Sequence, residues 1–263
     1  MTIMANRRSA APSSWEKVGK WYHELVGKDG HYYHKAIILP SMLRLLDIKN
    51  PREAQLVDIG CGQGILSRIL PKGVRYTGVD ASQTLLKQAR KAAHPSCEFV
   101  LADATKEFPL KEEGFSHGAF ILSLQNMADP EAALRNASKL LAPGGRLVLI
   151  LNHPCFRIPR QSSWNIDLEN KQQSRDIKRY MSSLEIPMQA NPSKGKKSVT
   201  TYSYHYPLSR IVTALSQAGL LVAEMEEWCS DKTSTGKNRA MENRARNEIP
   251  LFMAIVAQKP YKK

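Results

Sequence analysis

The chain has 263 residues, of which 42% are hydrophobic and 24% are charged, a balance typical of a globular protein and unlike that of a disordered or fibrous one. It has no apolar run of about 18 residues, so we expect no membrane span, and its first residues lack the apolar segment of a signal peptide. The four cysteines lie far apart with no CxxC pair, which favours reduced thiols and a cytoplasmic location over a disulfide framework.

The net charge of +14 lies mainly outside the centre of the chain. Residues 53–151 carry 11 basic and 10 acidic residues, whereas residues 1–52 and 152–206 each carry 9 basic and 4 acidic ones. Solubility is the simplest explanation of such basic appendages. An anionic substrate, or nucleic acid, facing them is the alternative.

The N-terminal part of the chain differs from the rest in composition and in hydrophobic pattern. Residues 1–14 are small, polar and basic, which predicts disorder, and residues 15–46 read as helices around the polar aromatic stretch GKDGHYYHK. From residue 54 onward, apolar runs alternate with helical patterns. The predicted strands are 54–60, 75–80, 97–103, 118–124 and 146–151, and the predicted helices are 64–70, 82–92 and 129–140. Such alternation indicates a parallel sheet covered on both faces.

The last part of the chain begins with an interruption of this pattern. Residues 152–206 are rich in Ser, Asn, Gln, Lys and Pro and have few apolar runs. A clear helix then follows at 207–220, and strands are predicted at 220–228 and 250–259. The basic stretch 238–250 has helix formers; we favour a solvated helix face over a phosphate-contacting patch.

The stretch LVDIGCGQG places Gly60, Gly62 and Gly64 between a strand and a helix. Glycine permits a tight turn and lets a ligand approach the backbone closely. Asp80 lies 20 residues past Gly60 at the end of the next strand, where an acid can accept both hydroxyl groups of a ribose. The spacing is GxGxG rather than the GxGxxG of dinucleotide-binding folds, so we expect a different nucleoside ligand.

Four motifs, LVDIGCGQG, TGVDAS, FVLADAT and LAPGGRLVLIL, together resemble the class I methyltransferases that use S-adenosyl-L-methionine (SAM). The resemblance covers residues 54–151 and extends to 207–258, and the lead-in SLQNMADPEAALRNASKLLAPGGRL is similar to that of the small-molecule quinone and sterol methyltransferases. It implies an α/β Rossmann-like methyltransferase fold, with a seven-stranded, mostly parallel sheet and helices on both faces. The lid insertion after the fifth strand is our addition to it.

The resemblance also implies a set of cofactor-binding residues. Asp58 and the loop from Gly60 through Cys61 and Gly62 to Gly64 would hold the methionine part of SAM, and Asp80 would bind the ribose beside Ala81. Asp103 and Ala104 would contact the adenine, and Ser123 and Gln125 would lie near the transferred methyl group. The family's usual histidine in this lead-in is replaced here by Gln125 or Asn126.

Candidates for acceptor contact and proton removal lie where the strands' carboxyl ends are expected. Histidine suits a base near neutral pH, and such sheets bind ligands beyond the carboxyl ends of their strands. His153 follows the fifth strand and is our first candidate, ahead of His205 at the end of the insertion and His34 on the N-terminal arm. Tyr22 and Tyr33 are the aromatic candidates on that arm.

His153 belongs to the sequence His-Pro-Cys, which has three interpretations. Cys155 as a nucleophile would resemble RNA cytosine methyltransferases, but its spacing from the strand differs and their second Pro-Cys is missing. A metal site would need two more ligands, so none is predicted. The favoured interpretation is a hinge, at which Pro154 ends the strand and a substrate lid begins.

We therefore predict four regions: a basic helical arm (1–52), a SAM-binding core (53–151), a substrate-lid insertion (152–206) and the rest of the core (207–263). The predicted function is methyl transfer from SAM to a small-molecule acceptor, for which an anion is one option. The alternatives are an RNA or polyanion methyltransferase, and a SAM-binding protein without transferase activity.

Overall fold

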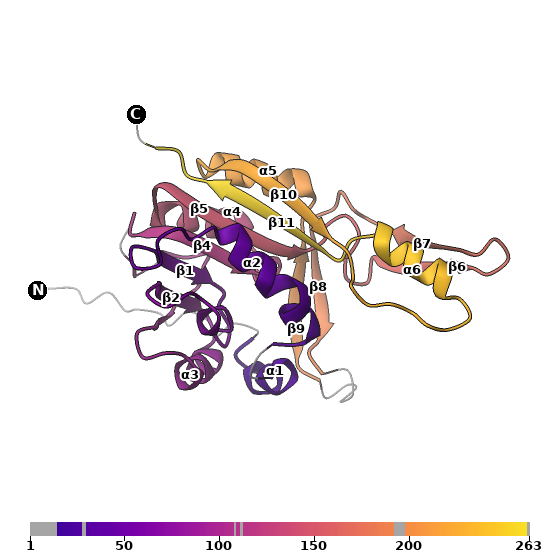
Figure 1. Ribbon diagram of the computed structural model, residues 1–263, viewed down its shortest axis with the longest axis horizontal. Helices are drawn as coiled ribbons and strands as arrows, with labels where there is room; N and C mark the ends of the chain where they lie inside the picture. Colours follow the sequence, from indigo (N-terminus) through magenta and orange to yellow (C-terminus); the bar gives the residue numbers. More distant parts are fainter. Residues whose placement is uncertain (1–14, 28–29, 108, 111–112, 192–197, 262–263) are drawn as a thin grey trace, which may run out of the picture.

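The computed structural model describes residues 15–27, 30–107, 109–110, 113–191 and 198–261; the predicted disorder of residues 1–14 lies outside them. A seven-stranded sheet in the order β10-β11-β5-β4-β1-β2-β3 forms the centre of the molecule (Figure 1). Its strands are β1 (Gln55–Ile59), β2 (Arg75–Asp80), β3 (Glu98–Leu101), β4 (Phe115–Ile121), β5 (Leu141–Asn152), β10 (Leu221–Trp228) and β11 (Phe252–Gln258).

The direction of the strands agrees with the predicted fold class. β1 pairs in parallel with β2 and β4, β2 with β3, and β4 with β5, whereas β11 is antiparallel to both β5 and β10. The predicted Rossmann-like sheet of seven strands, with the last strand antiparallel to the others, is confirmed. The carboxyl ends of β1, β2 and β4 consequently meet at one edge, where such sheets bind their ligands.

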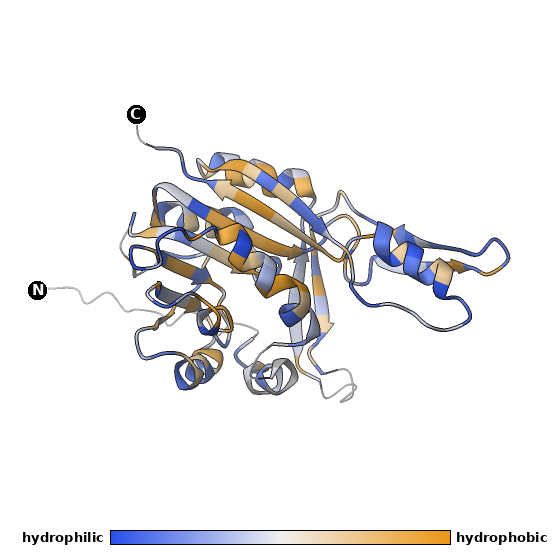
Figure 2. Cartoon of the chain, viewed as in Figure 1, coloured by the Kyte–Doolittle hydropathy of each residue, from blue (hydrophilic) through white to orange (hydrophobic). Residues whose placement is uncertain are grey.

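Helices cover both faces of the sheet, because each strand of its centre is apolar on both sides. On one face, α4 (Pro130–Leu140) and α5 (Leu208–Gln217) bury Leu134 and Leu215. On the other, the π-helical segment η1 (His34–Ile38) and α2 (Leu39–Leu46) bury Ile38 and Met42. Figure 2 shows the resulting apolar strands β5 and β11 between amphipathic helices.

Two further helices carry the walls of the site. α3 (Gln83–Ala92) begins at Ser82, whose hydroxyl accepts a hydrogen bond from the Leu85 amide, and this confirms the predicted N-cap. α1 (Gly19–Val26), on the N-terminal arm, packs against α3. The arm therefore reaches across the sheet's binding edge.

The predicted helix over residues 64–70 is wrong, because only a 3-10 turn, η2 (Leu66–Arg68), forms there. Gly64 adopts a left-handed conformation, and Pro71 disfavours the helical conformation at the residue before it. Too few residues remain between them for an α-helix. β4 also ends three residues earlier than predicted, at a left-handed Leu122, and the 3-10 turn η3 (Leu124–Asn126) follows it.

The insertion consists of two separate hairpins. The first pairs β6 (Ser162–Asp167) with β7 (Gln172–Ile177), and the second pairs β8 (Leu184–Gln189) with β9 (Thr200–His205). The first hairpin projects from the core together with α6 (Arg239–Glu248), which packs against β7, and α6 is largely hydrophilic (Figures 1 and 2). Only the second hairpin lies beside the binding edge of the sheet, where β9 contacts η3.

No helix in the described part of the chain is both long and apolar enough to cross a membrane.

Candidate functional site

A cavity of about 790 Å³ opens at the carboxyl ends of the parallel strands. Gly60, Asp80 and Leu122, which follow or end β1, β2 and β4, all line it. Trp15 closes it from the N-terminal arm, and Tyr204 closes it from β9. Its volume is within the range of small-molecule binding sites, roughly 300–1,000 Å³.

The glycine loop forms the floor of this cavity, and Gly60 is fixed there by packing. Gly60 has a φ of 74°, and a Cβ atom added to it would lie 2.5 Å from the Cβ of Ser123. Gly62, with a φ of 56°, faces open space instead, since nothing lies within 4 Å of an added Cβ. Gly60 thus permits the close approach of β1 and β4, while Gly62 leaves room for a ligand.

Asp80 holds the loop and keeps capacity for a ligand. Its carboxylate accepts hydrogen bonds from the amides of Gly62 and Ser82, both at 2.8 Å. A carboxylate has about four lone-pair sites, so two remain for the hydroxyl groups of a ribose. Burial raises the pKa of Asp80 to about 6. Hydroxyl donors would favour its ionised form.

Asp58 and His34 present open polar atoms beside the glycine loop. Asp58 accepts a hydrogen bond from the Tyr76 hydroxyl at 2.8 Å through Oδ2, but its buried Oδ1 has no hydrogen-bond partner among the described residues. The buried Nδ1 of His34 is in the same situation, and both residues line a second cavity of about 50 Å³. An amino-acid moiety with its ammonium and carboxylate groups would supply the missing partners, so these residues fit the methionine part of SAM.

Burial sets the protonation of this pair. It raises the pKa of Asp58 to about 7 and lowers the pKa of His34 to about 4, with a further contribution from His31. His34 is therefore a neutral imidazole near neutral pH. It is better suited to hydrogen bonding than to holding a proton taken from the acceptor.

The predicted adenine pocket also lies on the wall of the large cavity. Ala81, Asp103 and Ala104 line it together with the apolar Leu101 and Ala102. Oδ1 of Asp103 accepts hydrogen bonds from the amide and the hydroxyl of Thr105, at 2.9 and 2.8 Å. Oδ2 is thereby oriented for an external donor such as the adenine amino group.

The arm is attached to the site by contacts that the sequence did not suggest. Glu16, on the arm, accepts hydrogen bonds from the Ser82 hydroxyl and from both the amide and the hydroxyl of Thr84, at the start of α3. Gln63, in the glycine loop, contacts His23 and donates a hydrogen bond to the Gly27 carbonyl. No local motif predicts such contacts, because the two partners of each contact lie 36 to 68 residues apart in the sequence.

His153 does not face the cavity, contrary to its predicted role in acceptor contact. Its ring is fully buried, its Nε2 lies 2.5 Å from Oε1 of Glu227 on β10, and its Nδ1 accepts a hydrogen bond from the Cys155 amide. Burial lowers its pKa. β5 continues past the binding edge before it ends, so a residue two positions after its apolar run is directed to the neighbouring strands rather than to the cavity.

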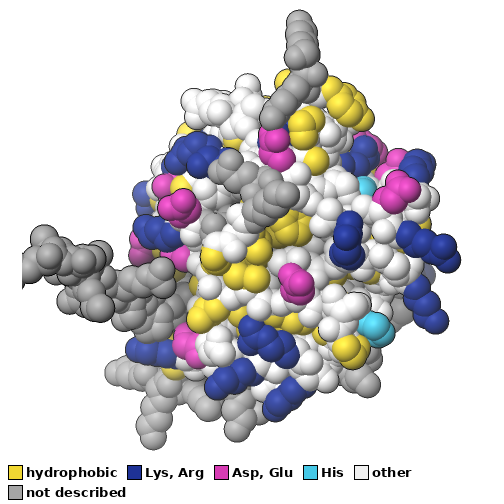
Figure 3. All heavy atoms as spheres, turned by 90° about the vertical axis from the view of Figure 1, so that its left-hand side faces the viewer, with side chains coloured by type: hydrophobic (Ala, Val, Ile, Leu, Met, Phe, Trp, Pro, Cys, Tyr) yellow, Lys and Arg dark blue, Asp and Glu magenta, His cyan; other side chains and the backbone are white. Residues whose placement is uncertain are grey.

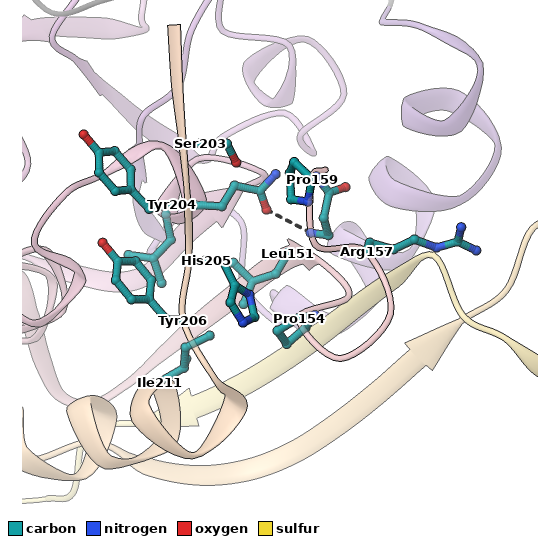
Figure 4. A pocket seen from close by; sticks show the side chains of 12 residues that line it. Leu151, Pro154, Arg157, Pro159, Ser203, Tyr204, His205, Tyr206 and Ile211 are labelled. Atoms are coloured by element: carbon teal, nitrogen blue, oxygen red, sulfur yellow. Dashed lines mark hydrogen bonds between the residues drawn. The ribbon is translucent and has the colours of Figure 1, made fainter. Parts of the chain in front are cut away.

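His205 and Gln125 line a separate small cavity, of about 30 Å³, together with Leu151 and Pro154 (Figure 4). Nε2 of His205 lies 2.7 Å from the Tyr180 carbonyl, and Oε1 of Gln125 accepts a hydrogen bond from the Asn152 amide. Neither side chain lines the large cavity. The structure thus does not support their predicted places as base and cofactor contact; Asn126, next to Gln125, lines the cavity instead.

The remaining predicted residues lie in three different places. Tyr22 and Ser123 line the large cavity, although the Ser123 hydroxyl donates to the Ile59 carbonyl. Tyr33 lies elsewhere, with its ring 5.6 Å from that of Phe252, so the predicted acceptor contact of Tyr33 does not fit the structure. Cys61 is buried at the small cavity beside the glycine loop, and burial raises its thiol pKa well above the ordinary value, which keeps it protonated.

The half of the cavity away from the ribose and adenine positions is lined by η3 and β9. Asn126 at the end of η3 and Met127 directly after it line this half, together with Tyr202 and Tyr204 of β9. The rings of Tyr204 and Tyr206 are stacked side by side, with centroids 6.4 Å apart (Figure 4). The Tyr206 hydroxyl bonds the carbonyls of Met127 and Ala128, so the two walls hold each other in place.

Basic side chains are spread over the outside of the molecule rather than gathered at the site. On the face shown in Figure 3, Lys and Arg are interspersed with Asp and Glu. No lysine or arginine is among the described residues that line the large cavity. The basic appendages therefore supply no positive charge to its described wall.

Comparisons with known proteins agree with this geometry. Residues 57–149 match a family described as a methyltransferase domain. A ubiquinone biosynthesis O-methyltransferase of Caulobacter sp. (strain K31) is 39% identical over 100 residues, 36% of this chain and 39% of that protein. A 2-phytyl-1,4-naphtoquinone methyltransferase of Thermosynechococcus vestitus is 32% identical over 111 residues, 40% of this chain and 49% of that protein. The chain thus spans less than half the length of these curated relatives.

A solved structure covers more of the chain. An S-adenosylmethionine dependent methyltransferase from Mesorhizobium loti superimposes with a TM-score of 0.67 at 26% identity, over 88% of this chain and all of the other. Together, these similarities agree with the predicted family resemblance, and the name of the solved structure includes the predicted cofactor, SAM.

Proposed function

We propose that this chain, which resembles the class I SAM-dependent methyltransferases, binds SAM and transfers its methyl group to a small-molecule acceptor held between η3 and β9. The observation that carries the proposal is a single cavity with two chemically different halves. One half has the carboxylates of Asp80 and Asp103 beside the glycine loop, and the other has Asn126, Tyr202 and Tyr204.

The chain's own residues bind and orient the reactants. SAM supplies a methyl group that is already activated on a sulfonium, so the protein contributes approach geometry and exclusion of water. Asp58, Asp80 and Asp103 are suited to hold the two ends of the cofactor. Trp15 and Glu16 cover the site from the arm, and Tyr204 covers it from β9.

A small acceptor is supported over RNA by the enclosure of the site. The arm, η3 and β9 border the cavity on three sides, and a folded polyanion would need a basic channel leading to it. The curated relatives named above carry the names of quinone methyltransferases. The match to the methyltransferase domain ends at residue 149, before β9, so that match does not extend to the acceptor wall on β9.

Two measurements test the proposal. Calorimetry with SAM should show binding to the protein, and Asp80→Asn should weaken it at least tenfold, whereas Asp176→Asn, on the exposed hairpin β6–β7, should not. SAM labelled with tritium in its methyl group should then transfer label to the small molecules of a deproteinised cell extract that still contains its RNA. Binding without transfer would support a non-catalytic SAM-binding protein, and label that ribonuclease releases from RNA would overturn the small-molecule acceptor.

A further inference from the structure

The charges on the cavity wall are all of one sign among the described residues. Glu16, Asp80 and Asp103 line it, and no lysine or arginine does. This contrasts with a chain that has a net charge of +14. The electrostatic field inside the cavity therefore opposes an anionic acceptor and favours positive charge on the bound molecules.

These carboxylates are poorly placed to remove a proton from an acceptor. Both oxygens of Glu16 accept hydrogen bonds from the start of α3, and both oxygens of Asp80 accept hydrogen bonds from backbone amides. Oδ1 of Asp103 is occupied by Thr105, and Oδ2 lies on the cofactor half of the wall, where the adenine amino group is its expected partner. A general base must reach its proton directly or through one water molecule, and groups bound in this way are fixed by other partners.

Other candidate bases are also missing from the described wall. His153 and His205 do not line the large cavity, and His34 lines only the smaller one beside Asp58. Tyr204 does line it, but burial raises the pKa of its phenol, which disfavours the phenolate that a base would need. A phenol, catechol or enol acceptor has to lose a proton as its oxygen or carbon is methylated, and this wall offers no evident base for that step.

Aromatic rings line the large cavity both in its acceptor half, on β9, and on the arm. Tyr202 and Tyr204 come from β9, and Trp15 and Tyr22, which meet edge to face at 5.3 Å, come from the arm. Aromatic faces attract cations and planar heterocycles, and the attraction increases where water is excluded. Stacking on Tyr206 holds Tyr204 in a fixed orientation.

We infer that the acceptor atom is a weakly basic nitrogen, on an uncharged aromatic or heteroaromatic amine, rather than an oxygen or a carbon. This inference rests on the proposed function. The nitrogen lone pair forms the new N–CH₃ bond, and the CH₃–S bond breaks with its electron pair going to sulfur. The positive charge moves from sulfur to nitrogen, so no proton has to leave during the transfer, and any proton on the product nitrogen is lost to water afterwards. The carboxylates of the cofactor half favour positive charge on the sulfonium, and the aromatic rings of the acceptor half favour it on the nitrogen.

The test follows the label into the product. The protein is incubated with trideuteromethyl SAM and a deproteinised extract of its source cells, and the extract is separated on a cation exchanger at low pH before mass spectrometry. A nitrogen-methylated product is positively charged at low pH and is retained, whereas methyl ethers and carbon-methylated quinones pass through. Label in the retained fraction, other than in SAM itself, is expected. Label only in the unretained fraction would overturn the nitrogen acceptor and leave the proposed function intact, and no labelled small molecule at all would overturn both.

Two variants of one position test the aromatic wall, with the unmethylated acceptor identified from the labelled product as the substrate. Tyr204→Phe keeps the ring and should keep the acceptor KM within about twofold, whereas Tyr204→Leu should raise it roughly tenfold with SAM affinity unchanged. If the Tyr204 hydroxyl acts as a base, Tyr204→Phe and Tyr204→Leu should both lose turnover, and the acceptor KM should stay unchanged in both. That result would also overturn the inference.

Discussion

The carboxylate of Glu16 accepts hydrogen bonds from the amide and the hydroxyl of Thr84, at 3.1 and 2.6 Å, although the two residues lie 68 positions apart. The contact joins the N-terminal arm to the first turn of α3, where a negative charge interacts favourably with the helix dipole. These hydrogen bonds lower the pKa of Glu16 even though its burial acts in the opposite direction. The arm is thus held closed over the cavity by an ionised side chain.

Glu16→Ala should loosen this closure without unfolding the core. We expect SAM to dissociate about tenfold faster, since three hydrogen bonds worth roughly 0.5–1.5 kcal/mol each are lost and partly replaced by water. Stopped-flow displacement of SAM measures the rate, and amide hydrogen exchange over residues 15–26 measures the opening. Glu98→Ala removes the same charge from an exposed position on β3 and should change neither the dissociation rate nor the exchange. If both variants had equal effects, the lost charge, and not the lost contact with α3, would be the cause.

The cofactor half of the site could be predicted from the sequence because its residues are close to one another along the chain. Gly60 follows β1, Asp80 ends β2 and Asp103 lies two residues past β3, so the alternation of strands and helices was enough to bring them to one edge. Asp129 and Ser82 likewise cap the helices that follow them. Local turn chemistry and strand order determine all of these positions.

The acceptor half could not be predicted in the same way. The direction of His153 depends on the extra length of β5 and on Glu227, 74 residues later. The place of Tyr204 depends on which of two hairpins in the insertion lies against the sheet, and both form by the same antiparallel pairing of six-residue strands. The alternation of side chains in β9 then sends Tyr202 and Tyr204 to the large cavity. Such long-range pairings leave no periodic pattern in the chain.

Gly60→Ala should destabilise the protein, whereas Gly62→Ala should mainly affect ligand binding. An added Cβ at Gly60 meets the Ser123 side chain at 2.5 Å, and at Gly62 it meets nothing within 4 Å. Both positions have positive φ, so each variant also carries backbone strain of about 1–3 kcal/mol. Thermal unfolding should show a greater loss for Gly60→Ala. The double variant Gly60→Ala with Ser123→Gly should recover part of that loss, and no recovery would contradict the proposed contact.

His153→Ala should lower stability rather than catalysis. The imidazole is buried, bonds Glu227 and accepts from the Cys155 amide, so its removal leaves a cavity and an unpaired amide, at a cost of roughly 1–3 kcal/mol. Urea unfolding measures the loss, and SAM affinity and turnover should remain near those of the wild type below the unfolding transition. A variant of normal stability with little turnover would restore His153 to the catalytic site.

SAM affinity should fall as the pH is lowered through the pKa values of two buried carboxyl groups. Burial raises the pKa of Asp58 to about 7 and that of Asp80 to about 6 in the free protein, and each must be ionised to accept a hydrogen bond from the cofactor's ammonium or ribose groups. Both shifts act in the same direction, because a protonated acid has to lose its proton before it binds. The dissociation constant should therefore increase up to about tenfold per pH unit below about 7, and more steeply below about 6. Calorimetric titrations with SAM across this pH range show whether the affinity falls as the pH is lowered. Asp58→Asn should bind more weakly throughout and should lose the change in slope near 7 while keeping the one near 6, whereas a wild-type affinity independent of pH would show that neither acid contacts the cofactor.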